Sequence, residues 1–142
     1  MPNVTGIYFL IDAKYTTVGS ECFKNNMAIM IDLPNTITTI GSYAFNGAMN
    51  LTTINLSNNI TSIGNDAFRP LDASTELKVV ITKLPDSLTT LGDRAFYRCG
   101  PKVTISTLPA GLNVIPDQCF MLTPNVAITD FPTREGTCSI GL

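Results

Sequence analysis

Histidine and tryptophan are absent from the 142 residues of this chain, and only four cysteines are present. Without histidine, the chain cannot build Ser-His-Asp or Cys-His catalytic centres, and it lacks the most common zinc ligand. The cysteines include no Cys-x-x-Cys pair, so the usual pattern of a structural zinc site is missing as well. The sequence therefore predicts no enzyme, no metal site and no cofactor.

Charge is also scarce. Charged residues make up 14% of the chain, well below the share of about 25% that is usual in globular proteins. The formal net charge is −2, and the nine Lys and Arg residues are scattered along the sequence. Because nucleic-acid binders carry a basic patch, we expect no nucleic acid among the partners.

Long apolar runs are missing too. The run at residues 7–11 (IYFLI) is far shorter than the roughly 20 residues that cross a bilayer, and it lacks the basic stretch that begins a signal peptide. We therefore expect no membrane insertion by this segment.

What the sequence does contain is an internal repeat. Phenylalanines recur at spacings of 22, 23, 28 and 24 residues, and each closes a segment with a similar pattern of apolar residues, a glycine and a small residue, except that Pro116 replaces the glycine in the fifth copy. One repeat of this length cannot bury its apolar side alone, so stacked copies that share a core are predicted. The phenylalanines that would line this core are Phe23, Phe45, Phe68, Phe96 and Phe120.

Each position in the repeat has a physical role. The aliphatic pair should point inward, and the glycine permits a tight turn, including a positive φ. The next residue is a good helix N-cap in all five copies, which predicts a short helical turn that buries the phenylalanine. Short β-prone runs between the copies predict a parallel ladder with one strand per coil. The N-cap candidates are Ser20, Ser42, Asn65, Asp93 and Asp117.

Residues 33–45 (LPNTITTIGSYAF) and 84–96 (LPDSLTTLGDRAF) carry the pattern most clearly, and it resembles the BspA-type leucine-rich repeat. The resemblance implies an α/β solenoid, a right-handed leucine-rich-repeat superhelix of about five repeats of roughly 23 residues. A parallel β-ladder would form one face, and short helical or 3-10 turns the other. The repeats of this single domain, 1–142, would cover residues 7–27, 28–50, 51–76, 77–101 and 102–124, with a partial copy at 125–142.

Outward residues of the predicted strands form the candidate ligand-binding face. Its middle and end are small, neutral and hydrogen-bonding. Its start is apolar, and this apolar start is either a contact patch or a surface that a cap or a neighbouring repeat covers. The candidate residues are Tyr8, Met30, Asp32, Thr53, Asn55, Thr82, Thr104 and Ser106.

The third copy departs from the pattern. It contains an insertion at residues 69–76, which is either a functional surface loop or tolerated length variation. From the fourth copy on, the inward strand residues also slip by one position relative to the following leucine or phenylalanine. An extra residue must therefore be absorbed as a bulge before Leu84.

The cysteines follow the repeat. Cys22 and Cys119 stand where the other copies have alanine, so both are predicted to be buried small residues. They lie four repeats apart, too far for a disulfide. A disulfide that joins Cys99 or Cys119 to Cys138 is left open.

The ends of the chain lack the polar capping repeats that a solenoid needs, so we interpret the sequence as a fragment or an uncapped module. Because open strand edges invite pairing, end-to-end self-association is also expected.

The resemblance implies a cell-surface or secreted location, because the family occurs mostly in large bacterial and protist surface proteins associated with adhesion. We therefore expect a non-enzymatic binding or adhesion module that presents a repetitive neutral β-face to a protein or glycan ligand on a host or neighbouring cell. The alternative is a structural spacer or assembly subunit, for example of a viral particle or surface appendage, joined through its uncapped ends.

Overall fold

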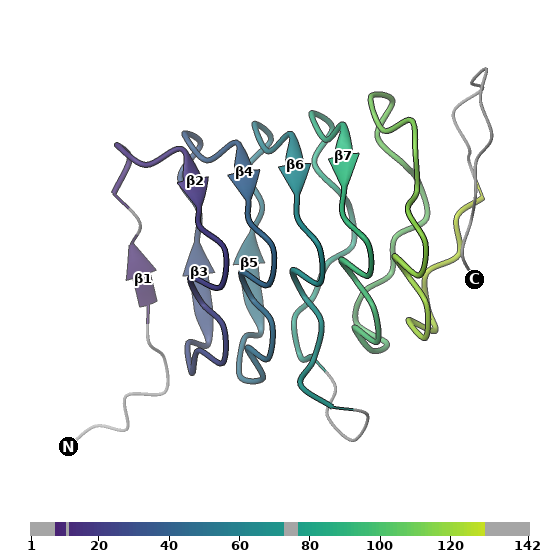
Figure 1. Ribbon diagram of the computed structural model, residues 1–142, viewed down its shortest axis with the longest axis horizontal. Helices are drawn as coiled ribbons and strands as arrows, with labels where there is room; N and C mark the ends of the chain where they lie inside the picture. The colour runs from purple at the N-terminus through teal and green to yellow at the C-terminus, as the bar shows by residue number, and fades with distance from the viewer. Residues whose placement is uncertain (1–7, 11, 73–76, 130–142) are drawn as a thin grey trace.

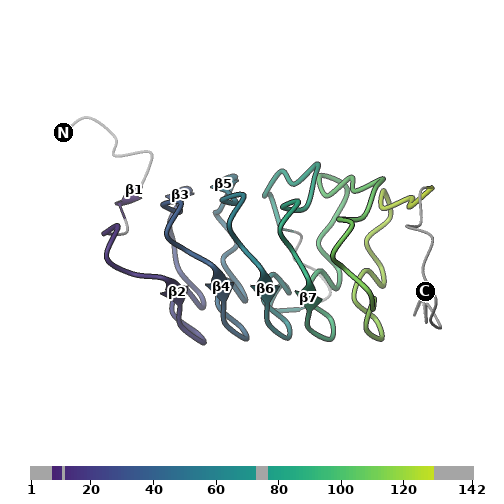
Figure 2. The same ribbon diagram turned by 90° about the horizontal axis from the view of Figure 1, so that it is seen from above.

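The computed structural model describes residues 8–10, 12–72 and 77–129, which form an elongated stack of coils (Figure 1). The strands are short and belong to two parallel sheets, one with the order β1-β3-β5 and one with the order β2-β4-β6-β7. Figure 2 shows the two rows of strands on different sides of the stack. The strands are β1 (Tyr8–Leu10), β2 (Thr17–Val18), β3 (Met30–Asp32), β4 (Thr39–Ile40), β5 (Thr53–Asn55), β6 (Ser62–Ile63) and β7 (Thr90–Leu91).

Strand neighbours in each sheet come from successive repeats, so the chain advances by one coil per repeat. Ile31 pairs with Ile54 in the first sheet, and both side chains are buried. In the second sheet the pairing aligns four buried aliphatic residues across the coils, namely Val18, Ile40, Ile63 and Leu91. The predicted inward positions are therefore confirmed at these strands. The prediction of one strand per coil is wrong, because the two residues before the glycine form a second row of strands.

The five repeat phenylalanines stand in a single file, as predicted. Neighbouring ring centroids lie 5.1–5.5 Å apart and the rings are within 13° of parallel. Burying a phenylalanine contributes roughly 1.5–3 kcal/mol, and each aromatic contact adds about 0.5–1.5 kcal/mol. The file thus couples every coil to the next.

The predicted helical turns are wrong: no helix occurs in the described part of the chain. Each coil instead continues from the second sheet into non-helical turns, which we call the turn stack, at residues 20–25, 42–47, 65–68, 93–98 and 117–122. The second residue after the glycine has a positive φ in every coil, as at Tyr43 (58°) and Asp66 (52°). A left-handed residue interrupts a right-handed helix.

Hydrogen bonds of the turn stack run between coils. The amides of Tyr43 and Phe45 donate to the carbonyls of Asn65 and Ala67 in the next coil, both at 2.8 Å. A helix would have directed these donors back along its own chain. Cross-coil bonding explains why five good N-cap residues precede no helix, because the turns satisfy their backbone groups with the neighbouring coil.

The repeat glycine has a different role from the one predicted. Positive φ occurs at Gly47 and Gly100, but not at the glycine that precedes each turn. A Cβ on Gly64 would instead lie 2.5 Å from the amide nitrogen of Ser42, which is backbone of the preceding coil. Glycine is therefore required for close approach of successive coils.

Pro116 replaces this glycine in the fifth coil and changes the ladder there. In the second, third and fourth coils the glycine amide donates to the preceding coil, as Gly92 does to Ile63 at 2.8 Å. Proline has no N–H to donate. The second sheet accordingly ends at β7 within the described residues.

Candidate functional site

The candidate site is the outer surface of the first sheet. Met30 and Thr53 are half-buried, whereas Asp32 and Asn55 are exposed. The Tyr8 side chain lies outside what the structure describes, so the apolar patch that includes it stays a prediction. Strand pairing across β1, β3 and β5 places Tyr8, Met30 and Thr53 at one register position and Leu10, Asp32 and Asn55 at another.

Polar contacts across this face join one coil to the next. The Asn55 side-chain amide donates to Asp32 Oδ1 at 3.2 Å, and the Thr52 hydroxyl donates to the Ile29 carbonyl at 3.2 Å. Asp32 forms no salt bridge with any described residue. The face therefore offers hydrogen-bonding groups with one acidic charge among them.

The remaining candidates, Thr82, Thr104 and Ser106, are exposed on the later coils. Here the ladder is reduced to a single bridge between Ile81 and Val103. The Thr104 amide donates to the Ile81 carbonyl at 2.9 Å, so the later coils still pair with each other.

The two halves of the face meet at a groove between β5 and the fourth coil, which we call the break groove. It has a volume of about 210 Å³. A backbone hydrogen bond still crosses the groove: the Val80 amide donates to the Thr52 carbonyl at 3.2 Å. The groove is lined by Ile54, Asn55, Leu56, Val80, Ile81, Thr82 and Lys83.

The slip of one residue at the start of the fourth copy explains the groove. Ile81 and Leu84 are both buried although they are three residues apart, whereas the corresponding Ile31 and Leu33 are two apart. The predicted slip of one residue is therefore present. Because the backbone cannot keep regular pairing through an extra residue, the sheet opens at this point.

Two exposed residues of the groove, Val80 and Lys83, were not among the candidate site residues, although the predicted strand register already placed Val80 on the outward face. Val80 is 52% exposed, an unusual position for an aliphatic residue in a strand region. Lys83 extends from the rim, where its ammonium lies 2.9 Å from Asp86 Oδ2. The slip before Leu84 was the signal that could have located both.

The burial of the cysteines depends on the coil in which each lies. Cys119 is buried as predicted, but Cys22 is exposed, which corrects the prediction. The alanines at this position lie between the turns of two neighbouring coils. Cys22 belongs to the first turn of the turn stack, and the described residues include no turn of a preceding coil that would cover it. Burial raises the pKa of the Cys119 thiol to about 12 and that of Cys99 well above 9. All three are free thiols, and Cys138 lies outside the described residues.

Within the residues that the structure describes, no group of three or more acidic or cysteine side chains is arranged to hold a metal ion. The same residues include no helix with the length and apolar character needed to cross a membrane.

Comparison with known proteins identifies the repeat. The BspA type leucine rich repeat region, in six copies, matches residues 7–82 and 72–140. The chain belongs to this leucine-rich-repeat family. The crystal structure of a T. pallidum leucine-rich repeat protein (TpLRR) is similar in fold, with a TM-score of 0.62 and 22% identity over 86% of this chain and 68% of that one. No curated protein matches the sequence.

Membership of the BspA-type family supports a repeat module of a kind that commonly binds proteins. Leucine-rich repeat proteins of this kind are typically non-enzymatic. The family occurs typically in surface or secreted bacterial proteins.

Proposed function

We propose that the chain is an adhesion module of a cell-surface or secreted protein, and that its first sheet binds a protein or glycan ligand through the break groove. The observation that carries this proposal is the groove itself. It is a concave feature of about 210 Å³ at the point where the first sheet ends, and it brings together Asn55, Val80 and Thr82 from two coils. The groove is smaller than the roughly 300–1,000 Å³ of a typical small-molecule pocket, so it suits one side chain or sugar ring of a larger ligand.

The groove offers complementary kinds of contact. Val80 provides exposed apolar surface, while the Asn55 amide and the Thr82 hydroxyl can donate and accept hydrogen bonds. Neighbouring outward residues, among them Thr53 and Asp32, extend the polar surface away from the groove. Affinity would then accumulate from many modest contacts along the face.

Binding of the purified chain to immobilised extracellular-matrix proteins and to a glycan array tests the proposal. Asn55→Arg and Thr82→Arg place bulky charges beside the groove at exposed positions, so both variants should fold and lose at least about ten-fold in affinity. Thr90→Arg is the matched control, because Thr90 is exposed on β7 of the other sheet. Equal effects of all three substitutions, or no binding by the wild type, would refute the proposal.

Assembly is the second candidate function, and a hollow at the first coil favours it. The hollow has a volume of about 480 Å³ and would accept a few side chains of a second copy stacked against β2. It is lined by Asp12, Lys14, Tyr15, Thr17, Val18, Cys22 and Phe23. Sedimentation velocity should show concentration-dependent association, and a monomer at all concentrations would exclude this candidate.

A further inference from the structure

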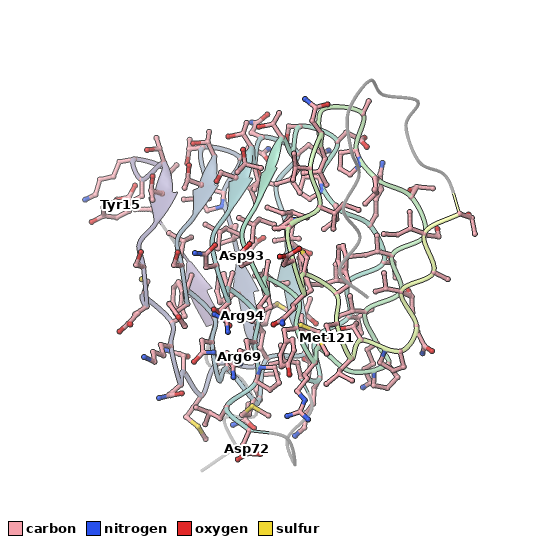
Figure 3. The ribbon with its side chains drawn as sticks, turned by 45° about the vertical axis from the view of Figure 1, so that its right-hand side comes forward. Tyr15, Arg69, Asp72, Asp93, Arg94 and Met121 are labelled. Carbon is pink, nitrogen blue, oxygen red and sulfur yellow. The ribbon has the colours of Figure 1, made fainter. Side chains whose placement is uncertain are left out.

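Three of the chain's four arginines gather on the turn stack, on a surface separate from the break groove. Arg69 follows the third turn, and Arg94 and Arg98 belong to the fourth. Figure 3 shows Arg69 and Arg94 near each other, between Asp93 and Asp72. This concentration is notable in a chain whose basic residues are otherwise scattered and whose net charge is −2.

A fully buried carboxylate holds two of the arginines. The Asp66 side chain is 0% exposed, and its Oδ1 accepts a hydrogen bond from Arg69 Nη1 at 3.1 Å. Its Oδ2 lies 3.3 Å from Arg94 Nη2 and accepts no hydrogen bond from the described residues. Asp66 therefore fixes two guanidinium groups from adjacent coils while neutralising only one of their charges.

The aromatic ring of Tyr97 brings the third arginine into the same group. The guanidinium carbon of Arg69 lies 5.3 Å from the ring centroid, and that of Arg98 lies 5.7 Å from it. Both distances are within the range of cation–π attraction. Arg98 forms no salt bridge with any described residue. The group of Arg69, Arg94, Tyr97 and Arg98, which we call the arginine cluster, thus carries three positive charges. Asp66 balances one of them, and Asp93 and Asp72 lie at the edges of the cluster (Figure 3).

The backbone of the cluster is fixed by cross-coil bonds. The carbonyl of Arg69 accepts from the Gly47 amide at 2.9 Å, and the Arg98 amide donates to the Met121 carbonyl at 3.0 Å. The arginine side chains still reach solvent, with Arg69 38% and Arg94 41% exposed. A guanidinium has five N–H donors, so most donors of the cluster stay available to an external acceptor.

We propose that the arginine cluster binds an acidic peptide segment of a partner protein through its carboxylates. Planar guanidinium groups match carboxylates in a two-bond geometry, and clusters of arginine recognise acidic motifs in this way. Tyr and Arg are also the residues that dominate the energy of protein interfaces. This surface is distinct from the break groove, so the two proposals can fail independently.

The surroundings favour a peptide over a sulfated polysaccharide. Exposed apolar side chains flank the cluster, namely Leu71, two residues after Arg69, and Leu122, in the turn after that of Arg98; each is 54% exposed. The carboxylate of Asp93 is also exposed on the same turn as Arg94 and would repel a polymer of uniform negative charge. A segment with both acidic and apolar residues suits this mixed surface.

Fluorescence anisotropy tests the proposal with a short labelled peptide that contains glutamate and leucine, and with the same peptide carrying glutamine in place of glutamate. The wild type should bind the acidic peptide, bind the glutamine peptide at least about ten-fold more weakly, and release the acidic peptide as salt is raised. Arg98→Glu should weaken binding by a similar factor. This variant should fold, because Arg98 does not contact Asp66.

Lys102→Glu is the matched control, since Lys102 is an exposed basic residue outside the cluster and the change in net charge is the same. It should change the affinity by less than about two-fold. Equal losses for Arg98→Glu and Lys102→Glu would reduce the binding to general electrostatics and overturn the proposal. Binding of a sulfated oligosaccharide without binding of the acidic peptide would overturn it as well.

Discussion

Replacing Gly64 with alanine tests how closely the coils approach. The added Cβ would lie 2.5 Å from the Ser42 nitrogen, 2.7 Å from the Gly41 carbonyl carbon and 2.8 Å from the Ser42 Cα. All three atoms are backbone, so no side chain can rotate away. Because non-bonded heavy atoms prefer separations of about 3.5–4.0 Å, the two coils must move apart by roughly 1 Å at this point.

That movement breaks hydrogen bonds. The Gly64 amide donates to the Ile40 carbonyl at 2.8 Å, and a shift of this size takes the bond beyond its useful range. Overpacking costs about 1–3 kcal/mol and each lost bond about 1 kcal/mol, while the stiffer unfolded chain returns about 0.4–1 kcal/mol. We expect Gly64→Ala to lower the free energy of unfolding by about 2–3 kcal/mol.

Gly19→Ala is the matched control, because a Cβ there meets no atom within 4 Å. It should leave stability unchanged or raise it by up to about 1 kcal/mol. Phe23→Ala in the same coil tests whether the first coil takes part in the measured unfolding transition. If it does, this substitution should lower the free energy of unfolding. Urea unfolding followed by circular dichroism should show a midpoint about 1 M lower for Gly64→Ala. Equal midpoints for the two alanine variants would refute the close-approach reasoning.

Three further predictions follow from the described contacts. In the native protein, Cys22 should react with iodoacetamide while Cys99 and Cys119 stay protected, and peptide mapping by mass spectrometry would contradict the burial pattern if all three reacted equally. The raised pKa of Cys119, about 12, means that its neutral thiol contributes stability below pH 9 that is lost as the pH rises toward 12. Between pH 9 and pH 12, Cys119→Ala should therefore lose less of its free energy of unfolding than the wild type does. Identical pH profiles of stability would contradict this. Thr123→Val should lower the free energy of unfolding by about 2 kcal/mol or more in thermal or urea unfolding, because the Thr123 hydroxyl bonds to the buried Cys99 amide and Phe96 carbonyl. Thr52→Val is the control and should cost at most about 0.5 kcal/mol, because the Ile29 carbonyl keeps its backbone donor. Equal costs for the two variants would count against this assignment.

The sequence predicts the core better than the turns. Inward positions such as Ile31, Ile40 and Phe68 could be predicted because their burial depends on periodicity, which is a local pattern. The turn conformation depends on bonds to a neighbouring coil, which no local pattern records. Ser42 and Asn65 are good N-caps in isolation, and the tertiary hydrogen bonds override that preference.

The two candidate surfaces also differ in how far the sequence alone predicts them. The outward face of the first sheet could be inferred from alternation, and the slip before Leu84 marked where its ladder would open. The arginine cluster could not be inferred, because Asp66, Arg69 and Arg94 meet through the stacking of two coils across the insertion. Asp66 follows the N-cap candidate Asn65, in a segment predicted as a helical turn, whereas its carboxylate is buried between two arginines.

A double-mutant cycle on the phenylalanine file tests the stacked-coil architecture most directly. Phe45 and Phe68 are in ring contact at 5.1 Å, whereas Phe45 and Phe96 are two coils apart and each contacts Phe68 instead. Phe→Leu substitutions at Phe45 and Phe68 should therefore show a coupling energy of about 0.5–1.5 kcal/mol in urea unfolding. The pair at Phe45 and Phe96 should be additive within about 0.5 kcal/mol. Additivity at Phe45 and Phe68, or equal coupling in both pairs, would contradict a single file of stacked rings.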